Sequence, residues 1–93
     1  MPRPQPSALS RAAAGRDFLH ARRQAYDAAL RGAWLDADRR LTALSDDGRF
    51  AADDWFTLGT ARYRLGQMEA ATDAARRAYA TDPDNPKVAH LLT

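Results

Sequence analysis

The chain has 93 residues, no cysteine, 28% charged side chains and a formal net charge of +2. A chain of this length forms about one domain, and without cysteine it has neither a disulfide framework nor a thiolate zinc site. Its two histidines, His20 and His90, fit none of the short metal-ligand spacings, so we expect no metal and no cofactor. Basic and acidic residues number 14 and 12 and are interleaved, which argues against nucleic acid as a partner.

Residues 1–15 are expected to form a flexible arm, and residues 16–93 the folded domain. Pro2, Pro4 and Pro6 occupy alternate positions in a stretch without an apolar run. Such a stretch is neither a signal peptide nor a membrane span. No later window holds the roughly 18 apolar residues that a transmembrane helix needs. We therefore expect a cytoplasmic protein that does not associate with a membrane.

The composition predicts an all-α chain. Alanine, leucine and arginine dominate, β-branched residues are scarce, and no stretch alternates between apolar and polar residues. Glycines and Asp/Pro-rich turns mark the breaks between helices. The first helix could extend back to Ser10, which would cap it. The pattern predicts five helices, at about 16–31, 33–45, 52–65, 68–81 and 86–93.

Two of the breaks between helices, at Gly32 and Gly66, are separated by the length of one two-helix unit. A bulky apolar residue follows each of these glycines two positions later, Trp34 or Met68. A period of about 34 residues that contains two helices is typical of a helical solenoid. The same register relates three further pairs, which are Ala37 and Ala71, Leu41 and Ala75, and Leu44 and Ala78.

This pattern resembles the tetratricopeptide repeat, whose motif is W-x₂-L-G-x₂-Y, followed by alanine, an aromatic residue and a late proline. In residues 52–85, Tyr63 lies one place after the usual tyrosine and Ala75 replaces the usual aromatic residue. The match there consists of Trp55, Leu58, Gly59, Gly66, Ala71, Ala78 and Pro83.

Residues 18–51 resemble the motif more weakly. Their second half fits through Gly32, Trp34 and Ala37, but Arg49 replaces the closing proline. The resemblance implies antiparallel helical hairpins stacked as a short right-handed solenoid, with a capping helix at 86–93. The first half departs from the motif because Ala21, Gln24 and Ala25 stand where tryptophan, leucine and glycine are expected.

The repeat motif also predicts how the second hairpin packs. Gly59 would let its two helices approach each other where Ala71 packs, since a side chain at either place would separate the backbones. Trp55 and Leu58 would supply most of the buried area. If the Trp55 ring is buried, its replacement by alanine should cost about 3–5 kcal/mol.

The resemblance implies a concave groove that binds an extended peptide or a partner helix and is lined by the first helix of each unit. Alternating basic and aromatic groups would favour an acidic partner with an apolar anchor. The family's clamp for acidic chaperone tails is not expected, because Tyr26 and Thr57 replace its two asparagines and Leu91 its last cation. The groove residues would be Leu19, Arg22, Arg23, Tyr26, Phe56, Thr57, Thr60, Tyr63, Arg64, Lys87 and His90.

Several of these residues also have purely structural interpretations. Paired arginines on helices usually face solvent beside an acid four residues away, as Asp36 with Arg40 and Asp73 with Arg77 would do. The aromatic groove residues are as compatible with the core as with the groove. The acids at positions 53 and 54 suit the start of a helix, where the dipole favours negative charge.

The sequence predicts a protein without catalytic activity. Its serines stand at expected caps or turns with no histidine nearby, and its glycines are isolated. We therefore expect a protein–protein interaction scaffold or adaptor. The alternatives are a small bacterial chaperone of the secretion type and an accessory or regulatory subunit of an enzyme complex. Apolar Val88, Leu91 and Leu92 on the last helix predict a homo-oligomer or a hetero-complex through the open C-terminal end.

Overall fold

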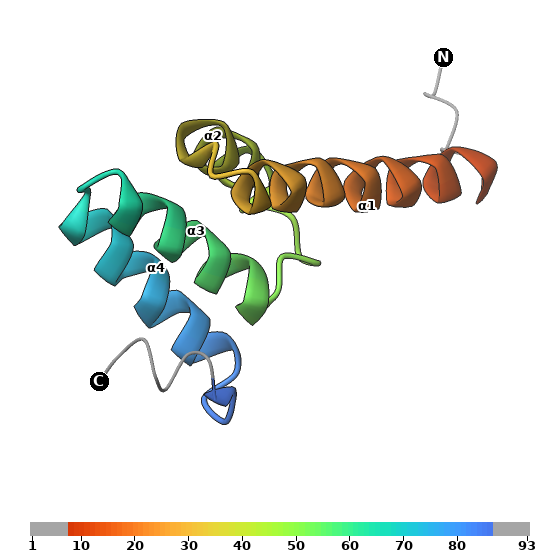
Figure 1. Cartoon of the computed structure of the whole chain (residues 1–93). Coiled ribbons are helices and arrows are strands. Elements are labelled where there is room, and N and C mark those ends of the chain that lie inside the picture. The colour runs from red at the N-terminus through yellow and green to blue at the C-terminus, as the bar shows by residue number, and fades with distance from the viewer. Residues whose placement is uncertain (1–7, 87–93) are drawn as a thin grey trace, which may run out of the picture.

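The computed structural model describes the backbone of residues 8–86 and the side chains of residues 16–86 (Figure 1). This part of the chain is helical and contains no strand, which confirms the all-α prediction. The fifth expected helix, at 86–93, lies outside the described residues except for Pro86, and so do Lys87 and His90. The described helices are α1 (Ala8–Leu30), α2 (Trp34–Leu44), α3 (Ala52–Arg64) and α4 (Met68–Thr81).

The start of α1 differs from the sequence-based expectation. The helix begins at Ala8, not at Arg16, so residues 8–15 continue the helix where a flexible arm was expected. Ser10 lies within the helix and does not cap it. The run of alanines before Gly15 explains the longer helix, because alanine has the highest intrinsic helix propensity. The other three helices begin and end within one residue of their expected bounds.

The turns that close the two hairpins have the same backbone geometry. Gly32 and Gly66 adopt φ angles of 75° and 79°, the left-handed region that favours glycine. At the first turn, the N–H of Gly32 donates to the carbonyl of Ala29 at 3.0 Å, and the next N–H donates to Ala28 at 2.9 Å. The corresponding bonds of the second turn measure 3.0 and 2.9 Å. Both turns are Schellman motifs. The two glycines that repeat in the sequence therefore occupy the same position in two equivalent turns.

The helices pack in chain order. Each one contacts the next, α1 also touches α3 near the start of that helix, and among the described residues α4 contacts only α3. Figure 1 shows the two hairpins, α1 with α2 and α3 with α4, lying against each other through α2 and α3. One face of α4 is consequently left without a neighbour in the described part of the chain.

Small side chains dominate the core. In the described part of the chain, Leu41 and Leu58 are the largest apolar side chains with no exposure. Alanine at the helix contacts lets the backbones approach closely. One cluster joins all four helices through Ala25, Leu41, Leu58 and Ala74, together with Phe50 from the turn before α3, and a second joins Ala28, Ala37 and Ala61.

Gly59 lies on the side of α3 that packs against α4. A Cβ atom added there would lie 3.4 Å from the Ala71 carbonyl oxygen and 3.5 Å from the Ala74 Cβ. A larger side chain at this position would push the two helices apart. Gly59 and Ala71 therefore lie in contact between α3 and α4, although 3.4 and 3.5 Å are ordinary contact distances, at which a single methyl group would fit.

Trp55 is less buried than the sequence suggested. Its ring is only partly covered, packs edge-on against Phe50 at 4.8 Å and lies under the Arg77 guanidinium at 5.1 Å. The predicted loss of about 3–5 kcal/mol on replacement by alanine required a buried ring, so we now expect a smaller loss. Phe18 and Phe50 are also core residues, which the sequence pattern did not predict.

The turn between α2 and α3 contains an ion pair between Asp47 and Arg49, which changes the pKa of Asp47. Two guanidinium nitrogens of Arg49 lie 2.9 and 2.7 Å from the Asp47 carboxylate oxygens, and the Arg49 backbone N–H also donates to this carboxylate at 2.9 Å. These hydrogen bonds lower the pKa of Asp47 to about 2. The stability that the pair contributes is therefore present above the ordinary aspartate pKa of about 3.9 and is lost as the pH falls through about 2.

Replacing Arg49 with alanine should raise the pKa of Asp47 toward the ordinary aspartate value, because the side-chain hydrogen bonds contribute most to the shift. A carboxyl ¹³C NMR titration of both proteins measures this change. The matched control is Arg39→Ala, an exposed arginine of α2, which should leave the Asp47 titration unchanged. An equal Asp47 pKa in wild type and Arg49→Ala would contradict the ion pair.

Candidate binding groove

A buried carboxylate joins the start of α3 to α1. Asp54 is 1% exposed, and its Oδ1 accepts a hydrogen bond from the Tyr26 hydroxyl of α1. Its Oδ2 accepts from the backbone N–H of Ala51 at 2.7 Å and lies 3.6 Å from Nη1 of Arg22. Ala51 precedes the first residue of α3, so Asp54 fills the acidic position of a capping box. A buried charge is tolerated when it is paired and hydrogen-bonded, as here.

The environment of Tyr26 keeps its hydroxyl protonated. Partial burial raises the pKa of this phenol well above its ordinary value, and the hydrogen bond and charge of Asp54 raise it further. Because the pKa is raised on folding, the stability from this contact is present below the ordinary tyrosine pKa of about 10 and declines at higher pH. At neutral pH, Tyr26 is therefore a fixed donor that connects α1 to α3.

Arg22 is held from two sides. Its guanidinium lies 5.4 Å from the centre of the Phe18 ring and 3.6 Å from Asp54, while 31% of its side chain remains exposed. The neighbouring Arg23 is exposed and has no carboxylate within 4 Å among the described residues. Of the two arginines, Arg22 is thus the more rigid and Arg23 the more available.

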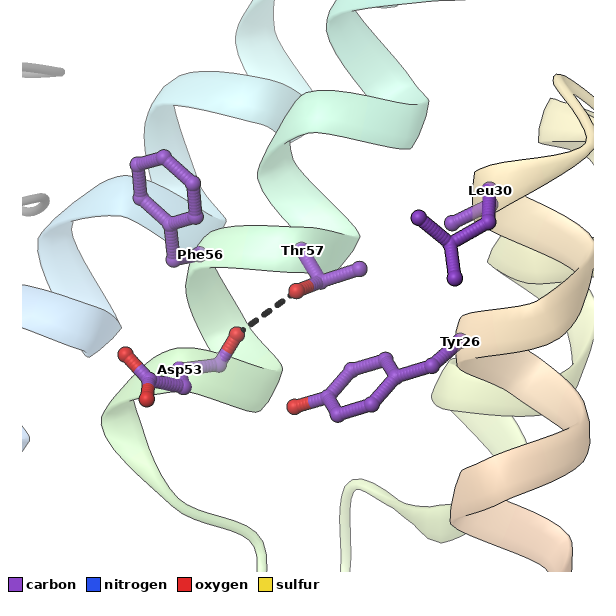
Figure 2. Close-up of a pocket in the computed structure, with 6 residues that line it drawn as sticks. Tyr26, Leu30, Asp53, Phe56 and Thr57 are labelled. Atoms are coloured by element: carbon purple, nitrogen blue, oxygen red, sulfur yellow. Dashed lines mark hydrogen bonds between the residues drawn. The ribbon is translucent and has the colours of Figure 1, made fainter.

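Two hollows on the surface share Tyr26. The first has a volume of about 330 Å³ and lies between α1 and α3; Figure 2 shows Tyr26 and Leu30 extending from α1 toward Thr57 of α3. It is mainly apolar, and its remaining lining residues are Ala29, Asp53 and Phe56. The second, of about 490 Å³, runs along α1 and is lined by Leu19, His20, Arg22, Arg23, Tyr26 and Asp27. We call the two hollows together the α1–α3 groove.

Six predicted groove residues line these hollows, and three described ones do not. The Thr60 hydroxyl donates to the carbonyl of Phe56 at 3.0 Å, and Tyr63 is 58% exposed without lining either hollow. Arg64 lies over the Trp34 ring of α2, 5.7 Å from its centre. Those that line the groove are Leu19, Arg22, Arg23, Tyr26, Phe56 and Thr57.

Two features of the groove were not expected from the sequence. Leu30 is not among the expected groove residues, yet it lines the first hollow and is 85% exposed. Asp54 was assigned to the helix dipole together with Asp53, and only the structure shows that Asp54 is buried while Asp53 is exposed. Asp54 stands three residues after Ala51, the residue that precedes α3. An acidic residue at this position is the signal that could have indicated a capping role.

Comparisons with protein-family models, with curated proteins and with solved structures give no match for this chain. Within residues 8–86, no helix is both long enough and apolar enough to cross a membrane. The same residues contain no group of three or more acidic or histidine side chains placed to hold a metal ion. The described residues thus form an all-helical fold with one hollow between α1 and α3 and a second along α1.

Proposed function

We propose that this protein is a non-catalytic interaction scaffold, built as a short tetratricopeptide-like solenoid, whose α1–α3 groove binds a segment of a partner protein. The observation that carries the proposal is the pair of hollows that meet at Tyr26. The first lies between α1 and α3 and the second along α1, and these are the two helices to which the family resemblance assigns the binding face. A secretion-type chaperone or an accessory subunit in the cytoplasm would use the same groove.

The chemistry of the groove favours a partner segment with an apolar anchor and a carboxylate. The first hollow offers the exposed Leu30 and the ring of Phe56, which suit an apolar side chain. The second offers Arg22 and Arg23, whose guanidinium groups can hydrogen-bond a carboxylate in bidentate geometry. The anchor and the acid would lie on either side of Tyr26.

The Asp54 network supports this function by fixing the floor of the groove. Tyr26 and Arg22 are both held by Asp54, so neither has to be ordered when a partner binds. A preorganised surface retains more of its contact energy as affinity, because less side-chain entropy is lost on binding. Asp54 is in this sense a positioning residue that does not itself contact the partner.

Panning a random peptide library against the full chain tests the proposal. We expect the selected peptides to combine an apolar residue with an acid, and Leu30→Glu to weaken their binding at least about tenfold by placing a charge in the apolar hollow. Because Leu30 is 85% exposed, this change should not affect folding. Fluorescence anisotropy with the labelled peptides measures the affinity.

The matched control is Leu35→Glu, which changes a half-exposed leucine of α2 outside both hollows. It should leave the affinity unchanged. Amide chemical-shift changes on peptide binding should fall on the residues that line the groove. Shifts confined to other surfaces, or equal affinity of wild type and Leu30→Glu, would show that the groove is not the binding site.

A further inference from the structure

Helix α3 covers α2 with two arginines. Nε of Arg62 lies 3.4 Å from Oδ1 of Asp38, and its Nη2 lies 3.4 Å from the Thr42 hydroxyl. The Arg64 guanidinium stacks over the Trp34 ring at 5.7 Å. The face of α2 that packs against α3 therefore presents three groups that interact favourably with a cation: a carboxylate, a hydroxyl and an aromatic ring.

The corresponding face of α4 has the opposite character. One repeat later in the sequence, Met68 takes the place of Trp34, and Thr72 and Arg76 take the places of Asp38 and Thr42. The positions of Asp38 and Trp34 thus carry no carboxylate and no aromatic ring on α4, and the position of Thr42 carries a cation. Met68, Thr72 and Arg76 are all exposed.

This face of α4 is open in the described part of the chain. Only α3 contacts α4 there, and α3 packs on the adjoining face of α4 through Gly59 and the α4 alanines. Met68, Glu69, Thr72 and Arg76 line a hollow of about 390 Å³. Glu69 is two helical turns, or about 10 Å, from Arg76 along the helix, and Arg76 has no carboxylate within 4 Å among residues 16–86.

We infer that this face of α4 docks a helix of a partner protein that carries a carboxylate where α3 carries Arg62 and an apolar side chain where α3 carries Arg64. The carboxylate would pair with Arg76, and the apolar side chain would pack on Met68. A second copy that presented its own α3 would instead place Arg62 against Arg76, and this like-charge contact disfavours self-association in that mode. The surface is separate from the α1–α3 groove, so the inference does not depend on the proposed function.

The probe is a pair of stapled helical peptides derived from α3 itself. One has the native sequence of residues 51–67, and the other carries Arg62→Glu and Arg64→Leu; the staple is needed because an isolated helix of this length is marginal in water. We expect the changed peptide to bind the full chain about tenfold more tightly than the native one. Arg76→Glu in the protein should reverse this preference, and Arg76→Gln should reduce it.

Two control variants separate this surface from other arginines. Arg39→Glu changes an exposed arginine of α2 that has no ion pair among the described residues, and it should keep the preference. Arg23→Glu, in the groove, should also keep it; if Arg23→Glu abolishes the preference and Arg76→Glu does not, the peptide binds in the groove and the inference is wrong. Equal affinity of the two peptides, or no binding of either, overturns the inference as well.

Discussion

Asp54→Ala is expected to lower the free energy of unfolding by about 3 kcal/mol, because it breaks a buried, paired carboxylate. The Tyr26 hydroxyl and the Ala51 N–H would lose their acceptor, and the Arg22 guanidinium would lose its counter-charge. An unsatisfied buried donor alone costs about 1–3 kcal/mol. Urea denaturation followed by circular dichroism measures the change.

Asp53→Ala is the matched control for this prediction, since it removes the neighbouring carboxylate from the same helix turn. Asp53 is exposed, and its loss should cost less than about 1 kcal/mol, the usual size of a surface charge at a helix N-terminus. A double-mutant cycle with Tyr26→Phe should show a favourable coupling between Tyr26 and Asp54. Equal denaturation midpoints for Asp54→Ala and wild type would show that the network does not hold α3 to α1.

Leu58→Ala should destabilise the protein to a similar extent. Leu58 is fully buried in the cluster that joins all four helices, and replacing a buried leucine with alanine costs about 2–5 kcal/mol through lost burial and the cavity left behind. For a domain of this size, a loss of about 3 kcal/mol lowers the Tm by roughly 15 °C. A thermal melt followed by circular dichroism measures the shift.

Leu30→Ala provides the corresponding control, because it makes the same chemical change at a leucine that is 85% exposed. Its effect on stability should stay within about 0.5 kcal/mol. If Leu58→Ala and Leu30→Ala melt at the same temperature, the core does not have the arrangement described above. The same pair of variants also separates stability from binding, since Leu30 lines the groove and Leu58 does not.

Features that depend on neighbours within a few residues were predictable from the sequence. The glycines at 32 and 66 do end the hairpin turns, with positive φ angles at both. The expected pairs Asp36 with Arg40 and Asp73 with Arg77 are present, each with a nitrogen–oxygen distance of 3.1 Å. These contacts form between residues four apart on one helix, so the helical spacing is sufficient to predict them.

The groove could be predicted only in part. Six of the residues that the family resemblance assigned to a groove line the two hollows, and three other described ones do not. The orientation of individual side chains depends on how the helices pack. Arg64 turns to the Trp34 ring, and Arg22 is held between Phe18 and Asp54. Each of these arrangements involves a residue from a different helix or turn.

The sequence alone determines that the chain is helical, where its hairpins turn, and that its pattern repeats from one hairpin to the next, because helix propensity and turn chemistry are local properties. The tertiary structure decides which polar residue is buried and which aromatic ring is not. Asp54 and its partner Tyr26 are 28 residues apart, and Trp55 remains partly exposed beside them. Whether adjacent residues face the core or solvent is set by the angle at which α1 meets α3, and that angle results from the packing of all four helices.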